Sequence, residues 1–179
     1  MVNAYLDIET TSLSPKDGEI VTIQYQRLDF ETREPIGDLI ILKAWESSEK
    51  DILEKFQKVF GTEQWSFVAH GYNLHFENKF LYQRSLVCGL ENPIKLFDRP
   101  TIDLHPIGIL MVGGFKGSGL DKITGKEEDG LYCLNCYDSK EYNKVEVYIK
   151  QEAKEFIKLL VWLTANMPKV LDEFRESLI

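Results

Sequence analysis

The sequence predicts an α/β domain with a mixed sheet, in which three antiparallel strands are followed by parallel strands and helices flank the sheet. Three observations predict this fold class. Three strand-like segments with short connections open the chain, helices and strands then alternate, and a long amphipathic helix fills much of the last third. The 179 residues contain no internal repeat and no linker rich in Pro, Gly or Ser, so we expect one domain over residues 1–179.

The first three strands are predicted from apolar segments at residues 2–9, 19–30 and 38–45. The stretch between the second and third segments, residues 31–37, reads "ETREPIG" and is typical of a turn. Because such short connections join neighbouring strands of opposite direction, we expect an antiparallel meander.

A helix is predicted next, over residues 47–61. Ser48 and Asp51 have the spacing of a capping box at its start, and apolar residues follow at helical intervals. Gly61 is a helix-stop signal.

The rest of the chain alternates between strands and helices, with one segment, residues 126–147, that has no clear pattern. The last helix has a continuous apolar side, formed by Ala153, Phe156, Ile157, Leu160 and Val161. The predicted elements are a strand at 65–70, a helix at 76–89, a strand at 101–104, a glycine-rich mobile loop leading into a short helix at 111–125, and a long helix at 145–167.

Composition limits the classes of protein that the chain can be. The hydrophobic fraction of 44% is that of a globular protein, and no apolar run approaches the roughly 20 residues of a membrane span. Three cysteines argue against a disulfide framework, and the N-terminus does not resemble a signal peptide, so we expect a cytoplasmic protein. The net charge of −8 argues against coating long nucleic acid by electrostatics alone, although bound metal ions could supply positive charge locally.

The first strand carries two acids in an apolar setting, in the stretch "AYLDIETTSLSP". Because side chains alternate along a strand, Tyr5, Asp7 and Glu9 share one face while Leu6 and Ile8 share the other. Carboxylates two residues apart, about 6.6 Å along a strand, can lean together onto divalent ions, and oxygen ligands favour Mg²⁺ or Mn²⁺. The alternative is that both acids lie on the solvated face of an edge strand.

Further motifs, in the same order along the chain, resemble those of the DEDD superfamily of 3′–5′ exonucleases, whose fold is RNase H-like. "LDIETTSL" is similar to the first motif, and "AHGYNLHFENKFL" to the second, with Asn73 matching its Asn and Glu77 in place of its Asp. "TIDLHPI" resembles the strand that carries an intermediate Asp, at Asp103. "YIKQEAKEFIKLL" is similar to the third motif of the tyrosine branch, including YprB-like domains, with Tyr148 as the tyrosine and Glu152 in place of the last Asp.

The resemblance implies a metal-dependent 3′–5′ exonuclease that hydrolyses phosphodiester bonds at the ends of single-stranded DNA or RNA by a two-metal mechanism. Mg²⁺ or Mn²⁺, two ions, would be the cofactor, and single-stranded 3′ ends the nucleic-acid partner, with a protein partner or a homo-oligomer also possible. Tyr148 would position the attacking water. The implied metal ligands are Asp7, Glu9, Glu77 and Glu152, and the implied contacts to the terminal nucleotide are Thr10, Thr11, Leu13 and Asn73.

Departures from the family pattern keep a second interpretation open. Glu77 and Glu152 each carry one methylene more than Asp, which could displace the metals, and Ser12 replaces the glycine usual in the first motif. The chain could therefore be a catalytically weakened RNase H-like module that binds nucleic acid or a replication or repair partner. Glu77 could also be an ordinary acid at a helix start, and Glu152 could form an ion pair with a nearby lysine, Lys150 or Lys154.

The C-x-x-C pair, Cys133 and Cys136, is weak support for zinc. A structural zinc site needs four ligands, and the other cysteine and the histidines are scattered along the chain. No histidine lies near the last acid motif, which favours the tyrosine branch over the histidine branch of the family.

Overall fold

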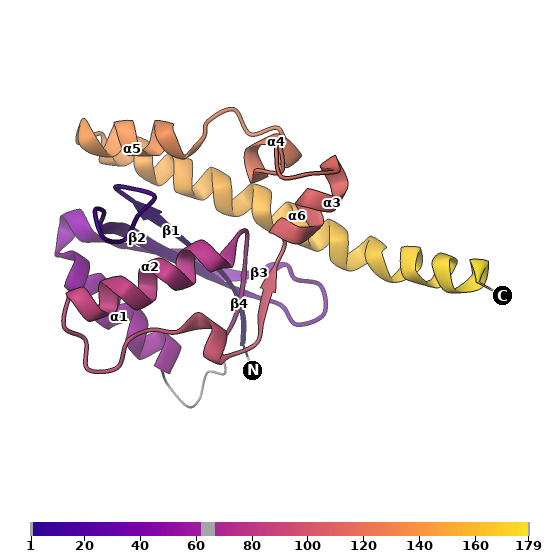
Figure 1. The fold of residues 1–179 in the computed structure, drawn as a ribbon, viewed down its shortest axis with the longest axis horizontal. Coiled ribbons are helices and arrows are strands. Elements are labelled where there is room, and N and C mark those ends of the chain that lie inside the picture. Colours follow the sequence, from indigo (N-terminus) through magenta and orange to yellow (C-terminus); the bar gives the residue numbers. More distant parts are fainter. Residues whose placement is uncertain (1, 62–66, 179) are drawn as a thin grey trace.

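The computed structural model describes residues 2–61 and 67–178, which form a five-stranded mixed sheet with helices on both faces (Figure 1). The strand order is β3-β2-β1-β4-β5. The strands are β1 (Val2–Thr10), β2 (Ile20–Leu28), β3 (Pro35–Lys43), β4 (Phe67–Gly71) and β5 (Thr101–Asp103).

The helices cover the sheet in two layers, with α1 and α2 on one face and α6 crossing the other (Figure 1). Two short 3₁₀ turns lie at residues 44–46 and 96–98. The helices are α1 (Glu49–Gly61), α2 (Leu74–Val87), α3 (His105–Val112), α4 (Leu120–Thr124), α5 (Gly130–Asp138) and α6 (Tyr142–Ser177).

The strand pairing confirms the predicted mixed sheet. β1 and β3 both pair antiparallel to β2, whereas β4 is parallel to β1 and β5 is parallel to β4. β1 is therefore the central strand, so the alternative that its acids lie on an edge strand is wrong.

Alternation along β1 divides the core in two. Leu6 and Ile8 pack in the cluster that the sheet forms with α1 and α2, whereas Tyr5 packs on the opposite face against Phe156 and Leu160 of α6. By the same alternation, Asp7 and Glu9 lie on the face of β1 that carries Tyr5, as predicted, and α6 covers this face. Within the described residues, no helix combines the length and apolar composition needed to cross a bilayer.

The start of α1 has the capping geometry that the sequence predicts. The Ser48 hydroxyl accepts a hydrogen bond from the backbone N–H of Asp51 at 3.1 Å. The strand predicted at 65–70 is described from Phe67 onward, and its residues 65 and 66 lie outside the described residues.

Two helices were not predicted. α3 covers residues 105–110, for which no element was predicted, and the first two residues of the loop expected over 111–125, and α5 lies within the segment that had no pattern. After His105 the sequence of α3 has no polar side chain and so shows no helical period. α5 is one short helix capped by Asp129, whose carboxylate accepts hydrogen bonds from the N–H groups of Leu131 and Tyr132.

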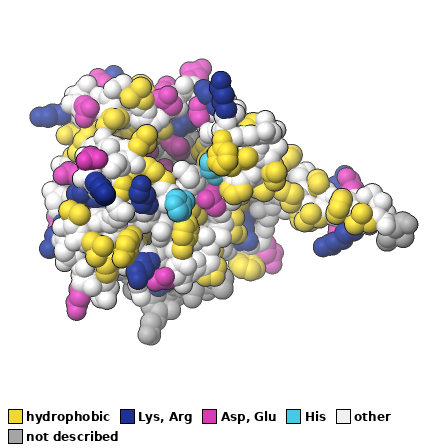
Figure 2. Space-filling model, viewed as in Figure 1, with side chains coloured by type: hydrophobic (Ala, Val, Ile, Leu, Met, Phe, Trp, Pro, Cys, Tyr) yellow, Lys and Arg dark blue, Asp and Glu magenta, His cyan; other side chains and the backbone are white. Residues whose placement is uncertain are grey.

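The last helix is longer than predicted. α6 begins before residue 145 and continues through Pro168, although a proline normally interrupts the helical hydrogen bonds. Beyond Pro168 the helix extends away from the sheet (Figure 1), and its residues 168–178 are exposed. Apolar side chains continue along this projecting end (Figure 2), namely Val170, Leu171, Phe174 and Leu178.

Burial of His70 on β4 makes stability depend on pH. His70 is fully buried, and burial lowers its pKa to about 4, although the contact of Nδ1 with the Val68 carbonyl at 3.0 Å opposes this shift. Its Nε2 atom has no hydrogen-bond partner. The unfolded chain therefore binds a proton below about pH 6.5 that the folded chain does not bind, so this residue lowers stability as the pH falls from about 6.5 toward 4.

We expect the free energy of unfolding of the wild type, relative to that of a His70→Gln variant, to fall by about 2 kcal/mol from pH 7 to pH 5. Glutamine cannot titrate, so only the wild type loses the contribution of this group on acidification. Urea unfolding at both pH values measures the difference, and an unchanged difference would contradict the proposed protonation of His70.

Candidate metal centre

Three carboxylates from two elements meet above the C-terminal end of β1. Asp7 and Glu9 extend from β1 and Glu152 from α6, and one oxygen of each lies within 4.8 Å of the others. All three side chains are half-buried, and among the described residues they are the group whose ligand atoms lie close enough to share a metal ion. Their donor atoms are all oxygen, which suits Mg²⁺ or Mn²⁺.

The fourth predicted acid, Glu77, lies in the first turn of α2 and is only 4% exposed. Its Oε2 atom is buried without a hydrogen-bond partner. Burial raises the pKa of Glu77 well above its usual range, and the charges of Asp7, Asp103 and Glu152 raise it further. A helix start favours negative charge by only about 0.3–1 kcal/mol, so that placement alone does not explain a buried, unpartnered carboxylate oxygen.

Burial and mutual repulsion also act on the acids of β1. Burial raises the pKa of Asp7 to about 7, and the charge of Glu152 adds to this, although the Gln24 amide donates a hydrogen bond to Asp7 Oδ2 at 2.7 Å. Burial likewise raises the pKa of Glu9 well above its usual range, with Asp7 and Glu152 contributing. The Cys133 thiol hydrogen-bonds to Glu9. Such a group of anions favours the binding of a cation.

A lysine that the sequence analysis did not select reaches into this cluster. Lys126 Nζ lies 2.9 Å from Glu152 Oε2 and donates a hydrogen bond to the Tyr148 hydroxyl, also at 2.9 Å. The alternative that Glu152 forms an ion pair with a lysine is therefore confirmed in kind, but the lysine is Lys126 rather than Lys150 or Lys154. Lys126 stands in the acidic, glycine-bounded stretch "GKEEDG", where no periodicity or motif distinguishes it from a solvated lysine.

Two pockets open beside the acids. The larger, about 470 Å³, is lined by Glu77, Tyr148 and the three clustered acids together with Thr10 and Leu13. The smaller, about 230 Å³, is lined by Asp7, Glu152 and Asn73. Both pockets thus reach the same pair of carboxylates.

The residues predicted to contact the terminal nucleotide differ in exposure and in their hydrogen bonds. Leu13 is 85% exposed at the rim of the larger pocket. The Thr11 hydroxyl accepts a hydrogen bond from the backbone N–H of Glu19 at 2.9 Å, so it closes the turn between β1 and β2. Asn73 is exposed and has φ of 68°, in the left-handed region, at the start of α2.

Asp103, which the resemblance matches to the intermediate Asp of the family, accepts hydrogen bonds from backbone N–H groups. Its Oδ1 accepts from the N–H groups of Asn73 at 2.8 Å and His105 at 3.0 Å, and its Oδ2 accepts from Leu74 at 2.9 Å. Because these bonds join the end of β5 to the starts of α2 and α3, Asp103 helps to fix the first turn of α2, which carries Glu77.

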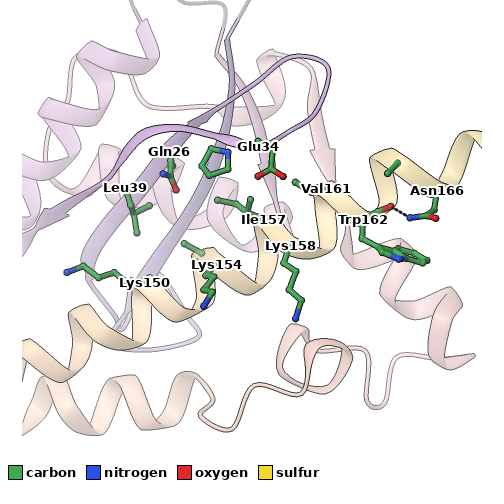
Figure 3. Close-up of a pocket in the computed structure, with 13 residues that line it drawn as sticks. Gln26, Glu34, Leu39, Lys150, Lys154, Ile157, Lys158, Val161, Trp162 and Asn166 are labelled. Carbon is green, nitrogen blue, oxygen red and sulfur yellow. Dashed lines mark hydrogen bonds between the residues drawn. The ribbon is translucent and has the colours of Figure 1, made fainter.

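Another pocket lies away from the acids. It occupies about 730 Å³ between α6 and the β2–β3 hairpin, with an apolar floor and Lys150, Lys154 and Lys158 along α6 (Figure 3). None of the four acids lines it. On the face shown in Figure 2, basic and acidic side chains are interspersed rather than gathered in one basic patch.

No protein-family model matches this chain, and no curated protein matches it. Solved structures share its fold. E. coli exonuclease I in complex with a dT13 oligonucleotide has a TM-score of 0.63 and 12% identity over 96% of this chain and 43% of that chain. The zinc ion bound form of the E. coli ExoI–ssDNA complex has a TM-score of 0.63 and 12% identity, and the match covers 96% of this chain and 42% of that chain. An ExoI/SSB-Ct complex has a TM-score of 0.62 and 11% identity, and the match covers 96% of this chain and 43% of that chain.

The chain therefore has the RNase H-like exonuclease fold, as the sequence predicts. It spans less than half the length of the exonuclease I chains. These neighbours do not support the YprB-like tyrosine branch, which stays a prediction.

Replacing Asp7 should stabilise the protein when metal is removed with EDTA. Because the folded pKa of Asp7 is raised from 3.8 to about 7, its contribution to stability is present at low pH and is lost as the pH rises through 7. We expect Asp7→Asn to raise the free energy of unfolding by about 1 kcal/mol or more at pH 8 and by little at pH 4.

Added Mn²⁺ should raise the melting temperature of the wild type and leave that of Asp7→Asn nearly unchanged, because ligands that bind only the folded state stabilise it. Thermal unfolding at pH 8 with EDTA and with Mn²⁺ measures both effects. Equal Mn²⁺ stabilisation of both proteins would place the metal elsewhere.

Proposed function

We propose that this chain is a metal-dependent 3′–5′ exonuclease that hydrolyses phosphodiester bonds at the ends of single-stranded DNA or RNA. The observation that carries the proposal is the convergence of Asp7, Glu9 and Glu152 within 4.8 Å, beside the buried and unpartnered oxygen of Glu77. This arrangement occurs in a chain with the fold of exonuclease I. We also propose a single exonuclease domain over residues 1–179, because no linker divides the chain, and a cytoplasmic location, because three cysteines do not make a disulfide framework.

The four acids would hold divalent ions, Mg²⁺ or Mn²⁺, and the resemblance implies two of them. Bound ions would make a hydroxide available near neutral pH and stabilise the negative charge of the transition state. Asp7 is already oriented by Gln24 and by the Tyr5 hydroxyl, which donates to Oδ2 at 3.3 Å, so its free oxygen atom is positioned before any ligand binds.

Tyr148 is suited to orienting a water molecule and not to removing its proton. Burial raises the pKa of Tyr148 far above its ordinary value of 10, and the nearby charges of Glu152 and Glu9 raise it further. The phenol therefore stays protonated at neutral pH, and it can donate a hydrogen bond while accepting one from Lys126.

The larger pocket beside the acids would receive the terminal nucleotide. Thr10 and Leu13 line it, and the exposed Leu13 side chain offers an apolar surface to a base. Asn73 would contact the nucleic acid from the smaller pocket, which Asp7 and Glu152 also line. Thr11 would support the turn that carries Leu13.

Partners are proposed from the neighbours and from charge. The solved structures contain a dT13 oligonucleotide, single-stranded DNA or SSB-Ct, which supports nucleic acid and a protein as partners here. A net charge of −8 disfavours tight unaided binding of long strands, so a partner protein or a second copy of the chain could deliver the end.

A catalytically weakened module remains the second candidate, and one observation favours it. Lys126 neutralises part of the acid cluster, and a protein that had lost its metal ions could use such a lysine to stabilise the remaining carboxylates. Such a module would bind nucleic acid or a replication or repair partner without cleaving it.

A nuclease assay separates the two candidates. With Mn²⁺ and a single-stranded oligonucleotide labelled at its 5′ end, we expect stepwise shortening from the 3′ end, and a product ladder on a denaturing gel measures it. Asp7→Asn should lower the rate by on the order of 10²-fold or more, because the group that positions the metal is lost.

Glu155→Gln is a matched control, since Glu155 lies on α6 near Glu152 but contacts the exposed Lys158 at 3.9 Å. This variant should cleave at the wild-type rate. Absence of cleavage by the folded wild type would support the weakened module, whereas cleavage that survives Asp7→Asn would show that the activity arises elsewhere.

A further inference from the structure

Lys126 is placed as an internal cation of the acid cluster. It follows Gly125 between α4 and α5, and its side chain is only 3% exposed. Its ammonium group contacts Glu152 and the Tyr148 hydroxyl, each at 2.9 Å, and lies 4.0 Å from the centre of the Tyr148 ring. A buried ammonium group is costly without such partners, so these contacts hold it in place.

The charge of Lys126 reaches the other acids as well. Burial raises the pKa of Asp7 and of Glu9, and the Lys126 charge opposes the rise in both. By contrast, Lys43 of β3 and Lys150 of α6 pair with Glu146, and Lys158 of α6 pairs with Glu155, which are acids outside this cluster.

The contacts divide the cluster into two halves. On the Glu152 side, a full positive charge is already bound at 2.9 Å. On the β1 side, the partners of Asp7 and Glu9 are neutral, since Gln24 binds Asp7 and Cys133 binds Glu9. Cation binding is therefore most favourable on the β1 side, where negative charge is not balanced.

We propose that, in the substrate-free protein, the Lys126 ammonium group takes the place of a second divalent ion at Glu152, so that the cluster binds one divalent ion, on the side of Asp7 and Glu9. This rests on the metal-binding part of the proposed function and not on hydrolysis. A second ion would then need the oxygens of a bound substrate phosphate to compete with Lys126, which makes Lys126 a positioning residue that couples metal occupancy to substrate.

Counting bound Mn²⁺ tests the proposal. Free Mn²⁺ is followed by electron paramagnetic resonance as it is titrated into the substrate-free full chain at neutral pH. We expect one bound ion per chain for the wild type and for Lys126→Arg, which keeps the charge. Lys126→Met has a similar length but no charge and should bind a second ion.

Lys122→Met is the matched control, because Lys122 lies four residues before Lys126, is 70% exposed and pairs with Asp121. It should bind one ion, like the wild type. Two ions in the wild type, or one ion in Lys126→Met, would overturn the proposal.

The Asp7→Asn variant distinguishes this failure from failure of the proposed function. If Asp7→Asn abolishes binding while the wild type and Lys126→Met bind equally, only the role of Lys126 is wrong. If the wild type binds no Mn²⁺, or if Asp7→Asn binds as the wild type does, the metal centre itself is wrong and both proposals fail.

If circular dichroism shows that Lys126→Met does not fold, a wild-type crystal soaked in Mn²⁺ tests the proposal instead. One anomalous peak near Asp7 and Glu9, with Lys126 still in contact with Glu152, supports the proposal. Two peaks, with Lys126 displaced from Glu152, overturn it.

Discussion

The dominant constraint in this structure is the repulsion among carboxylates that the fold buries together. Asp7 and Glu9 stand on the central strand of the sheet, where neighbours on both sides and α6 above exclude most water. Because like charges at short distance in a poorly solvated place raise one another's pKa, the group is tolerated only if protons, a lysine or a metal ion balance it. Lys126, between α4 and α5, meets part of that need through its contact with Glu152.

The scaffold places each acid by a different rigid element. β1 is fixed by ladders to β2 and β4, and Gln24 from β2 orients Asp7. α6 packs Tyr5 of the same strand against Phe156, with ring centres 5.1 Å apart, one turn beyond Glu152. Side chains held by regular elements keep their relative positions better than side chains on loops, which a metal centre requires.

The sequence predicts the antiparallel order of the first three strands and the shared face of Asp7 and Glu9, because turns and side-chain alternation are local properties. Motif spacing selects Glu77 and Glu152; the structure brings Glu152 to Asp7 and Glu9, and the role of these acids as metal ligands stays a prediction. The sequence does not predict α3, which has no polar side chain after His105 and so shows no period, or α5, which is one short helix. Lys126 could not be selected either. Its role arises from the chain reversal at Gly125, where φ is 75°, and from contact with residues on α6 that are distant in the sequence.

Asp103 shows how a structural acid can imitate an active-site acid. Its charge acts on Glu77, yet its carboxylate accepts hydrogen bonds from backbone N–H groups at the starts of α2 and α3. Loss of this carboxylate would loosen the helix that carries Glu77 and thereby impair the site indirectly. In a mutational survey scored by turnover alone, Asp103 would be counted as a ligand, and only amide hydrogen exchange at the first turn of α2 would reveal its architectural role.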